Sequence, residues 1–229
     1  MENSLEEYII QTYRKRAANY DFTANLYYLF GYREWAYRQR AVKALKLQPG
    51  DTVLELACGT GLNFSLFQHY IGPTGQIIGV DFTDAMLEQA RKRVANQGWK
   101  NVTLIQHDAS TFQIPPQAKA VFSSFAFSIF PDTEQVLTRI ANSFAPGGRL
   151  VLLELQVPTS WPSWLASAVV ALMRPFAIKD EWVIRRPWET IRKTIKALLD
   201  NVEVTEHYFG LSYIISAEKS APSLKGRQT

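Results

Sequence analysis

From residue 52 onward, short apolar runs alternate with longer stretches in which apolar side chains recur every three or four residues. The short runs predict strands and the longer stretches predict helices, because the two periodicities match the two backbone geometries. Strands are expected over 52–57, 76–81, 102–106, 120–125 and 149–156, and helices over 62–71, 83–97 and 133–144. Strands separated by helices favour parallel pairing through right-handed crossovers.

The flanking regions follow other patterns. Before residue 52, helices are expected over 3–18 and 33–46, forming an N-terminal helical cap within 1–48. Residues 157–200 are rich in Trp, Pro and basic side chains, and predict two or three helices that form a lid or insertion. Residues 201–208 and 210–218 predict an antiparallel hairpin. We therefore expect a single domain over 1–218 and a loose polar tail over 219–229.

Composition excludes several kinds of site. With one cysteine, Cys58, the chain has no intrachain disulfide and no cysteine-based zinc or iron–sulfur site. Three widely spaced histidines do not predict a metal site. The N-terminal stretch is not typical of a signal peptide, and the apolar run 161–173 is too short to cross a bilayer, so a cytoplasmic protein is expected. The net charge of +4 leaves the partners and the oligomeric state open.

Two glycines, Gly59 and Gly61, follow the first predicted strand. Open parallel sheets bind ligands at this edge, where glycine lets the backbone turn sharply and approach the ligand. The position of the third glycine in a dinucleotide-binding turn is Phe64, which argues against NAD, and the chain has no phosphate-binding P-loop motif. The alternative is that the glycines only form a tight connection between strand and helix.

Acidic residues end the next two strands. Asp81 follows the second strand, where a carboxylate can bind both hydroxyls of a ribose. Asp108 follows the third strand and can accept a hydrogen bond from an adenine amino group. Each of them alone could be a helix cap or a solvated loop residue. Polar features at three successive strand ends together indicate a nucleoside-binding site.

The segments VLELACGTG, GVD, HDA and APGGRLVLLE resemble the motifs of class I S-adenosylmethionine-dependent methyltransferases over residues 50–156. The resemblance implies an α/β fold with a doubly wound, mostly parallel seven-stranded sheet whose last strand is antiparallel. It also implies S-adenosylmethionine as the cofactor. The residues that would line the cofactor are Glu55, Ala57, Gly59 and Gly61 on the methionine and ribose side, Asp81 at the ribose, Phe82 and Met86 beside the adenine, Asp108 and Ala109 at its edge, and Ser124 and Phe125 near the sulfonium.

The segments YRKRAANYD (13–21) and FGYREW (30–35) are similar to those of ubiquinone/menaquinone C-methyltransferases and of bacterial phosphatidylethanolamine N-methyltransferases. In such enzymes this segment caps the cofactor, which implies that Tyr20 faces the methionine moiety; alternatively Tyr20 is a core aromatic. Quinone enzymes usually carry an Arg-Asn pair where this chain has Ser128 and Ile129. The form of 123–132 favours N-methylation of a phospholipid head-group amine. The alternatives are methylation of a quinone or other small metabolite, and a non-catalytic cofactor-binding protein.

A lipid acceptor and a peripheral membrane contact are also indicated by the apolar segment 161–176 and by two basic residues that follow it, Arg185 and Arg186. The alternatives are a helix buried on the sheet and a solvated basic face. Arg185, Arg186 and Tyr28 are the candidate acceptor-binding residues. A proton acceptor is sought among Tyr20, Tyr27, Tyr28, His107 and His207, with Tyr20 and His107 as the catalytic candidates. Nucleic acid is not expected, because the chain has no Asn-Pro-Pro-Tyr motif and no appended basic domain.

Overall fold

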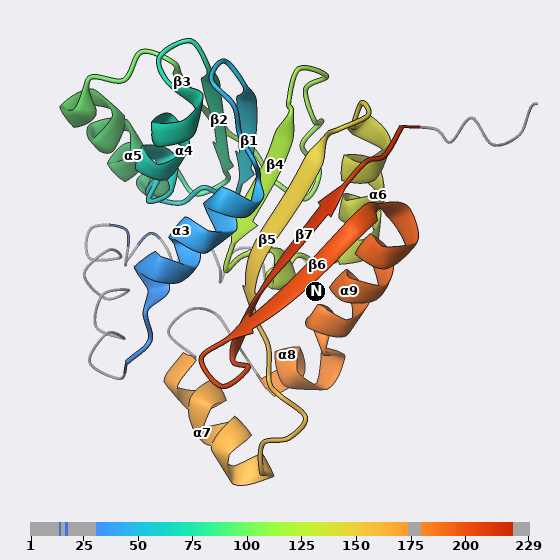
Figure 1. Cartoon of the computed structure of the whole chain (residues 1–229). Helices are drawn as coiled ribbons and strands as arrows, with labels where there is room; N and C mark the ends of the chain where they lie inside the picture. The colour runs from blue at the N-terminus through green and yellow to red at the C-terminus, as the bar shows by residue number, and fades with distance from the viewer. Residues whose placement is uncertain (1–13, 15–16, 18–30, 174–179, 222–229) are drawn as a thin grey trace, which may run out of the picture.

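The computed structural model describes residues 14, 17, 31–173 and 180–221, and in these ranges it forms a seven-stranded sheet in the order β3-β2-β1-β4-β5-β7-β6 (Figure 1). Strands β1 to β5 pair in parallel, whereas β7 is antiparallel to both β5 and β6. The strands are β1 (Thr52–Leu56), β2 (Gln76–Asp81), β3 (Val102–Gln106), β4 (Ala120–Ser124), β5 (Arg149–Leu155), β6 (Asp200–His207) and β7 (Ser212–Glu218). The expected fold class is confirmed.

Helices cover both faces of the sheet (Figure 1). They are α3 (Glu34–Ala44), α4 (Phe64–Ile71), α5 (Asp84–Gln97), α6 (Thr133–Ser143), α7 (Ser163–Met173), α8 (Asp180–Arg185), α9 (Pro187–Leu198) and the 3₁₀ turn η3 (Phe127–Ile129). One apolar core lies between the sheet and α3, α4 and α5, and the other between the sheet and α6 and α9. The central strands are apolar on both faces for this reason: Leu54 belongs to one core and Val53 to the other.

The expected helices and strands occur, with shifts at their ends. Four strands, β1, β4, β5 and β6, stop one residue earlier than expected. In three of them the next residue, Ala57, Phe125 or Tyr208, has a positive φ angle of 54°, 56° or 50° that takes the chain out of the extended conformation. The final strand begins at Ser212 rather than at residue 210, after the turn that joins β6 to β7. The expected helix over 3–18 lies outside the described residues except for Arg14 and Ala17.

The expected insertion after β5 contains α7, α8 and α9. Helix α9 buries Trp188, Ile191 and Ile195 against the sheet and is therefore one of the flanking helices of the fold. Helix α7 has a different surface: it carries no charged side chain, and Trp164 is 71% exposed. In Figure 1 α7 lies below the sheet, at the end towards which β5 runs.

Strand β6 forms one edge of the sheet, and most of its residues are exposed. Its sequence, DNVEVTEH, includes three carboxylates, those of Asp200, Glu203 and Glu206. The register between β6 and β7 is irregular between Asp200 and Glu203.

Candidate cofactor and acceptor site

The strand order reverses direction between β1 and β4, so the loops that follow these two neighbouring strands diverge to opposite faces of the sheet. The loop after β1 contains Gly59 and Gly61, with φ angles of 55° and 74° that L-residues rarely adopt. A Cβ on Gly61 would lie 2.5 Å from the Phe64 ring, whereas a Cβ on Gly59 would meet no atom within 4 Å. Gly61 is therefore needed for packing, and Gly59 leaves open space at the strand ends.

Asp81 joins the ends of β1 and β2. Its Oδ2 accepts a hydrogen bond from the Gly59 N–H at 2.8 Å, and its Oδ1 accepts one from the Thr83 N–H at 2.9 Å. The side chain is buried, which raises the pKa of its carboxyl group, and the two N–H donors oppose that rise. A carboxylate has about four acceptor sites, so Asp81 can still accept a hydrogen bond from a ligand hydroxyl beside these N–H groups and the Thr83 side chain.

Glu55 lies one strand away, on β1, and is 1% exposed. Its Oε1 accepts a hydrogen bond of 2.6 Å from the Asn63 side-chain amide, whereas Oε2 has no hydrogen-bond partner among the described residues. Burial raises the pKa of Glu55 to about 8, against the opposing effect of the Asn63 hydrogen bond. A second donor, such as a ligand ammonium group, would complete the coordination of this carboxylate.

A buried arginine that the sequence did not indicate completes this cluster. Arg38 on α3 is 4% exposed and donates from Nη1 to Ser124 Oγ at 2.9 Å and to Asn63 Oδ1 at 3.1 Å. Its Nη2 also lies 2.7 Å from Glu34 Oε1. The five side chains form one polar cluster beneath the glycine loop, which we call the Arg38 cluster: Glu34, Arg38, Glu55, Asn63 and Ser124.

Asp108 lies at the start of the loop that follows β3. Its carboxylate accepts from the N–H and the hydroxyl of Ser110, at 2.8 Å and 2.7 Å, and Ala109 between them is buried. His107 is exposed, with its ring against Phe112 and its Nδ1 2.8 Å from the Asp108 carbonyl oxygen. The contacts to Ser110 hold this turn in place, with one carboxylate at its centre.

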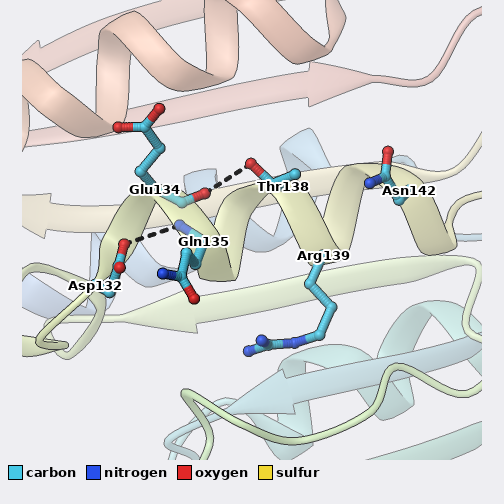
Figure 2. Close-up of a pocket in the computed structure, with 6 residues that line it drawn as sticks. All are labelled: Asp132, Glu134, Gln135, Thr138, Arg139 and Asn142. Atoms are coloured by element: carbon cyan, nitrogen blue, oxygen red, sulfur yellow. Dashed lines mark hydrogen bonds between the residues drawn. The ribbon is translucent and has the colours of Figure 1, made fainter.

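Arg139 also stabilises this turn: from α6, on the other face of the sheet, it donates a hydrogen bond to the Ser110 carbonyl oxygen. Figure 2 shows Arg139 projecting from α6, on the rim of a polar surface hollow of about 660 Å³. Asp132 caps this helix by accepting from the Gln135 N–H at 3.0 Å. The hollow is lined by residues of α6 and its cap, with no part of the glycine loop.

Apolar side chains at and just before the start of α5 lie on the side of the site that is expected to bind adenine. Met86 is buried and Phe82 is half-buried, with the Phe82 carbonyl oxygen accepting from Gln106 at 3.2 Å. Arg14, from the predicted N-terminal cap, makes two hydrogen bonds to Asp84 in the first turn of α5, at 2.8 Å and 3.0 Å. The N-terminal segment therefore reaches the cofactor side of the sheet at Arg14. Three expected site residues of this segment lie outside the described residues: Tyr20, Tyr27 and Tyr28.

On the side of β4, a row of aromatic rings leads away from Ser124. The ring of Phe125 lies 6.5 Å from that of Tyr32, and Tyr32 lies 5.3 Å from Tyr208. Tyr208 then meets Phe209, at 5.5 Å, and Phe209 is 85% exposed. This aromatic row runs from the end of β4 to the surface at the turn between β6 and β7.

The other expected acceptor residues have partners within the protein. Arg185 donates from Nη2 to the Ser128 carbonyl oxygen at 2.8 Å, and Arg186 pairs with Glu189 at 3.0 Å. His207 stacks on Tyr37 with a ring distance of 4.9 Å, and burial together with the nearby Arg40 lowers its pKa. His207 is thus part of the contact between α3 and β6.

The chemistry of these groups fits S-adenosylmethionine. The cofactor has an ammonium group, two ribose hydroxyls and an adenine amino group, all of which are donors. The strand ends offer three carboxylates, those of Glu55, Asp81 and Asp108, and one of these has an oxygen with no partner among the described residues. Glu55 fits the ammonium group, Asp81 the ribose and Asp108 the adenine, beside the open space at Gly59.

Comparison with known proteins agrees with this fit. Residues 1–169 match the model of the ubiE/COQ5 methyltransferase family. A demethylmenaquinone methyltransferase of Lactobacillus johnsonii is 32% identical over 157 residues, covering 68% of this chain and 64% of that relative's length. The ubiquinone/menaquinone biosynthesis C-methyltransferase of Legionella pneumophila (strain Lens) is 26% identical over 224 residues, covering 92% of this chain and 88% of that relative.

Among solved structures, the DhpI–SAH complex superimposes with a TM-score of 0.65 at 18% identity, covering 97% of this chain and 100% of that one. That likeness supports the fold. The expected enzyme class and cofactor, an S-adenosylmethionine-dependent methyltransferase, are confirmed by the family match and by the named relatives. The chain belongs to the ubiE/COQ5 methyltransferase family.

Proposed function

We propose that this chain transfers a methyl group from S-adenosylmethionine to a ring carbon of a quinol, the reduced form of a quinone. The observation that carries the proposal is the aromatic row at the end of β4, which begins beside Ser124. Two relatives support the same acceptor, since one is named a demethylmenaquinone methyltransferase and the other a ubiquinone/menaquinone biosynthesis C-methyltransferase. These names favour the quinone alternative over the phospholipid amine expected from residues 123–132.

The cofactor would be held mainly by the strand ends. In this assignment Glu55 binds the ammonium group, Asp81 the ribose hydroxyls and Asp108 the adenine, while the backbone at Ala57, Gly59 and Gly61 forms the floor. The remaining predicted contacts are Phe82, Met86 and Ala109 around the adenine, and Ser124 and Tyr20 near the methionine. When bound, the cofactor supplies a methyl group on a positively charged sulfur.

The neighbourhood of Ser124 suits an aromatic acceptor. The guanidinium of Arg38 lies 5.2 Å from the centre of the Phe125 ring, and its charge is paired with Glu34. An electron-rich phenol ring beside Phe125 would be attracted to the same guanidinium. Apolar carbon attached to the ring could then follow the aromatic row towards Phe209.

The ring carbon of a quinol is nucleophilic because the adjacent hydroxyl oxygen donates electron density to it. The carbon–methyl bond would form as the methyl–sulfur bond breaks, and that carbon would then lose its proton to a base. His107 follows β3, which is separated from β4 by β2 and β1, a distance of about 14 Å at the usual strand spacing. This argues against His107 as the base, and leaves Tyr20 as the other sequence-based candidate.

Methyl transfer from labelled S-adenosylmethionine tests the proposal. The purified chain is incubated with a chemically reduced, short-chain demethylnaphthoquinol and, separately, with vesicles that contain phosphatidylethanolamine. Label on the naphthoquinol ring, absent when the quinone is left oxidised, is the expected result. Label in the phospholipid amine instead would overturn the choice of acceptor while preserving the enzyme class.

We also propose that the end of the molecule around α7 contacts an anionic membrane. The three most exposed large apolar side chains among the described residues are Trp164 (71%), Ile184 (82%) and Phe209 (85%), and Ile184 is followed directly by Arg185 and Arg186. An exposed Trp, together with Arg side chains beside another exposed apolar residue, suits the interface of an anionic bilayer. Within the ranges that the structure describes, no helix has the length and apolarity needed to span a membrane.

Sedimentation with vesicles of phosphatidylglycerol and phosphatidylcholine tests this contact. Trp164→Ser and Phe209→Ser are expected to lower the bound fraction severalfold. Ser167→Ala, another exposed position on α7, serves as the control and should bind as the wild type does. Equal binding by all the variants would overturn the proposal, and so would unchanged binding to purely zwitterionic vesicles.

A further inference from the structure

A buried carboxylate on β5 holds the loop that follows β4. Glu154 is 0% exposed, and its Oε1 accepts from the N–H groups of Ala126 and Phe127 at 3.1 Å and 2.7 Å. Its Oε2 accepts from the Ser128 N–H at 3.3 Å. Three successive backbone donors thus converge on one side chain, at the amino end of the turn η3.

The same loop is held from the opposite side. Arg185 on α8 donates to the carbonyl oxygen of Ser128, so this one residue has its N–H bound by Glu154 and its C=O bound by Arg185. The loop begins at Phe125, whose N–H donates to the Leu153 carbonyl oxygen at 2.7 Å and whose φ is 56°. The conformation of residues 125–128 is therefore fixed at both ends.

This loop is the continuation of the strand that ends at Ser124, beside the Arg38 cluster and the aromatic row. It therefore lines the acceptor side of the proposed site. The carboxylates that face the cofactor side, by contrast, belong to β1, β2 and the turn after β3. A change confined to the loop after β4 should affect the acceptor and spare the cofactor.

Burying a carboxylate at this position costs free energy. The neighbours of Glu154 along β5 are apolar and buried, and burial raises the pKa of Glu154 to about 7 even though three N–H groups favour the ionised form. Replacing such buried groups by apolar residues is often neutral or stabilising, so stability alone does not explain the choice.

We propose that Glu154 is a positioning residue for methyl transfer, which fixes the loop 125–130 so that the acceptor ring is aligned for reaction. Arg185 assists it through the Ser128 carbonyl oxygen. This inference rests on the proposed methyl transfer at the same site, and it predicts separate effects on the acceptor and on the cofactor.

The test combines two readouts on Glu154→Gln. Hydrogen exchange at the amides of residues 126–128, measured with S-adenosylhomocysteine and without acceptor, should become faster, because the new amide group opposes the Ser128 N–H. The rate constant for methyl transfer at saturating cofactor should fall about tenfold to a hundredfold, since misalignment of the reacting groups has effects of this size. The Kd for S-adenosylhomocysteine should stay within about twofold, the change expected from a residue remote from the cofactor.

Two further variants complete the design. Glu218→Gln neutralises a carboxylate on β7 that pairs with Arg149 at the opposite end of β5, and should match the wild type in every readout. Arg185→Gln changes an exposed side chain, so it should fold even if Glu154→Gln does not, and should lower the same rate constant by a smaller factor. A water-soluble acceptor without vesicles keeps any membrane contact of Arg185 out of the measurement.

A total lipid extract with labelled cofactor separates this inference from the proposed function. The fraction that takes the label in the wild type identifies the acceptor, and the ratio of variant to wild-type label in that same fraction tests the loop. Label in another fraction would overturn the quinol proposal alone. Unchanged labelling by Glu154→Gln and Arg185→Gln, or a parallel loss of S-adenosylhomocysteine affinity, would overturn the role of Glu154. A chemically reduced extract that takes no label with the wild type would overturn both.

Discussion

The guanidinium of Arg38 lies 2.9 Å from the hydroxyl of Ser124, which joins the helix before the sheet to the end of β4. The same side chain pairs with Glu34 on its own helix and reaches Asn63 at the start of α4. Arg38 and Asn63 are buried, so a donor or acceptor that is left without a partner there costs free energy.

Replacing Arg38 with Lys should therefore lower the free energy of unfolding by about 1–3 kcal/mol, the cost of leaving a buried hydrogen-bonding group without its partner. Lysine keeps the charge but loses the planar fork that serves several acceptors at once. Urea denaturation measures the change. Arg40→Lys, at an exposed position on the same helix, is the control and should change the value by less than about 0.5 kcal/mol. Equal changes in the two variants would show that the contacts of the Arg38 cluster contribute no more to the free energy of unfolding than an exposed arginine does.

Asp81→Asn should weaken S-adenosylhomocysteine binding about tenfold to a hundredfold, because hydrogen bonds to a charged acceptor contribute about 1.5–3 kcal/mol. The amide also places a donor against the N–H of either Gly59 or Thr83. Isothermal titration calorimetry gives the Kd. The matched control is Asp51→Asn at the other end of β1, where the carboxylate accepts from the Gln48 N–H. A Kd for Asp81→Asn equal to that of the control would remove Asp81 from the proposed site.

Gly61→Ala should destabilise the fold more than Gly59→Ala does. Both substitutions strain a left-handed backbone by roughly 1–2 kcal/mol, but only the methyl group on Gly61 collides with the Phe64 ring, at 2.5 Å. Thermal unfolding of the two variants gives the comparison. The double variant Gly61→Ala/Phe64→Leu should lose less stability than the sum of the losses in the two single variants, because the smaller leucine side chain removes the collision. Strict additivity would contradict this explanation.

Stability should fall as pH rises from about 5 to about 8. Burial raises the pKa of Glu154 to about 7 and that of Glu55 to about 8, above the ordinary value of 4.5. The folded state then binds more protons than the unfolded state, so the stabilisation is complete below the ordinary value and is lost as pH passes through the raised values. Arg38, Asn63 and Asp81 face Glu55, whereas the Ser128 side chain, the loop amides and Tyr213 face Glu154.

Urea midpoints at a series of pH values test this dependence. Glu55→Gln should flatten the curve near pH 8, and Glu154→Gln should flatten it near pH 7, because each removes one of the two titrations. Glu218→Gln should leave the shape unchanged. A wild-type stability that rises between pH 6 and pH 8 would contradict the sign derived from these two groups.

The sequence was sufficient for the strands and their parallel pairing, and it predicted residues for the cofactor side of the site, because each of these depends on local signals. Apolar runs mark buried strands, and glycines and acids at their ends mark the ligand edge. Arg38 was missed because its partners Asn63 and Ser124 are 25 and 86 residues away, so nothing near it in the chain distinguishes it from a solvated arginine. The positive φ of Ala57 was missed for a similar reason, since alanine does not signal a left-handed turn.

Glu154 did have a signal that could have been used. It is a single acid within the apolar run LVLLEL, as Glu55 is within TVLEL, and an acid in a buried strand needs partners. What the sequence does not contain is the identity of those partners, the N–H groups of a loop whose fold depends on α8 and β5 together. The acceptor side was therefore harder to predict than the cofactor side.

The exposed acids of β6 have a consequence for unwanted association. An edge strand has unpaired backbone N–H and C=O groups to which a strand of another chain can bind, and long exposed edge strands are prone to this kind of aggregation. Here the edge carries Asp200, Glu203 and Glu206, and its ladder is interrupted between the first two of these. A second copy approaching in the same way would bring like charges together along a distorted template. The charged and irregular edge strand therefore allows the fold to keep a long hairpin at the edge of its sheet without favouring aggregation through added strands.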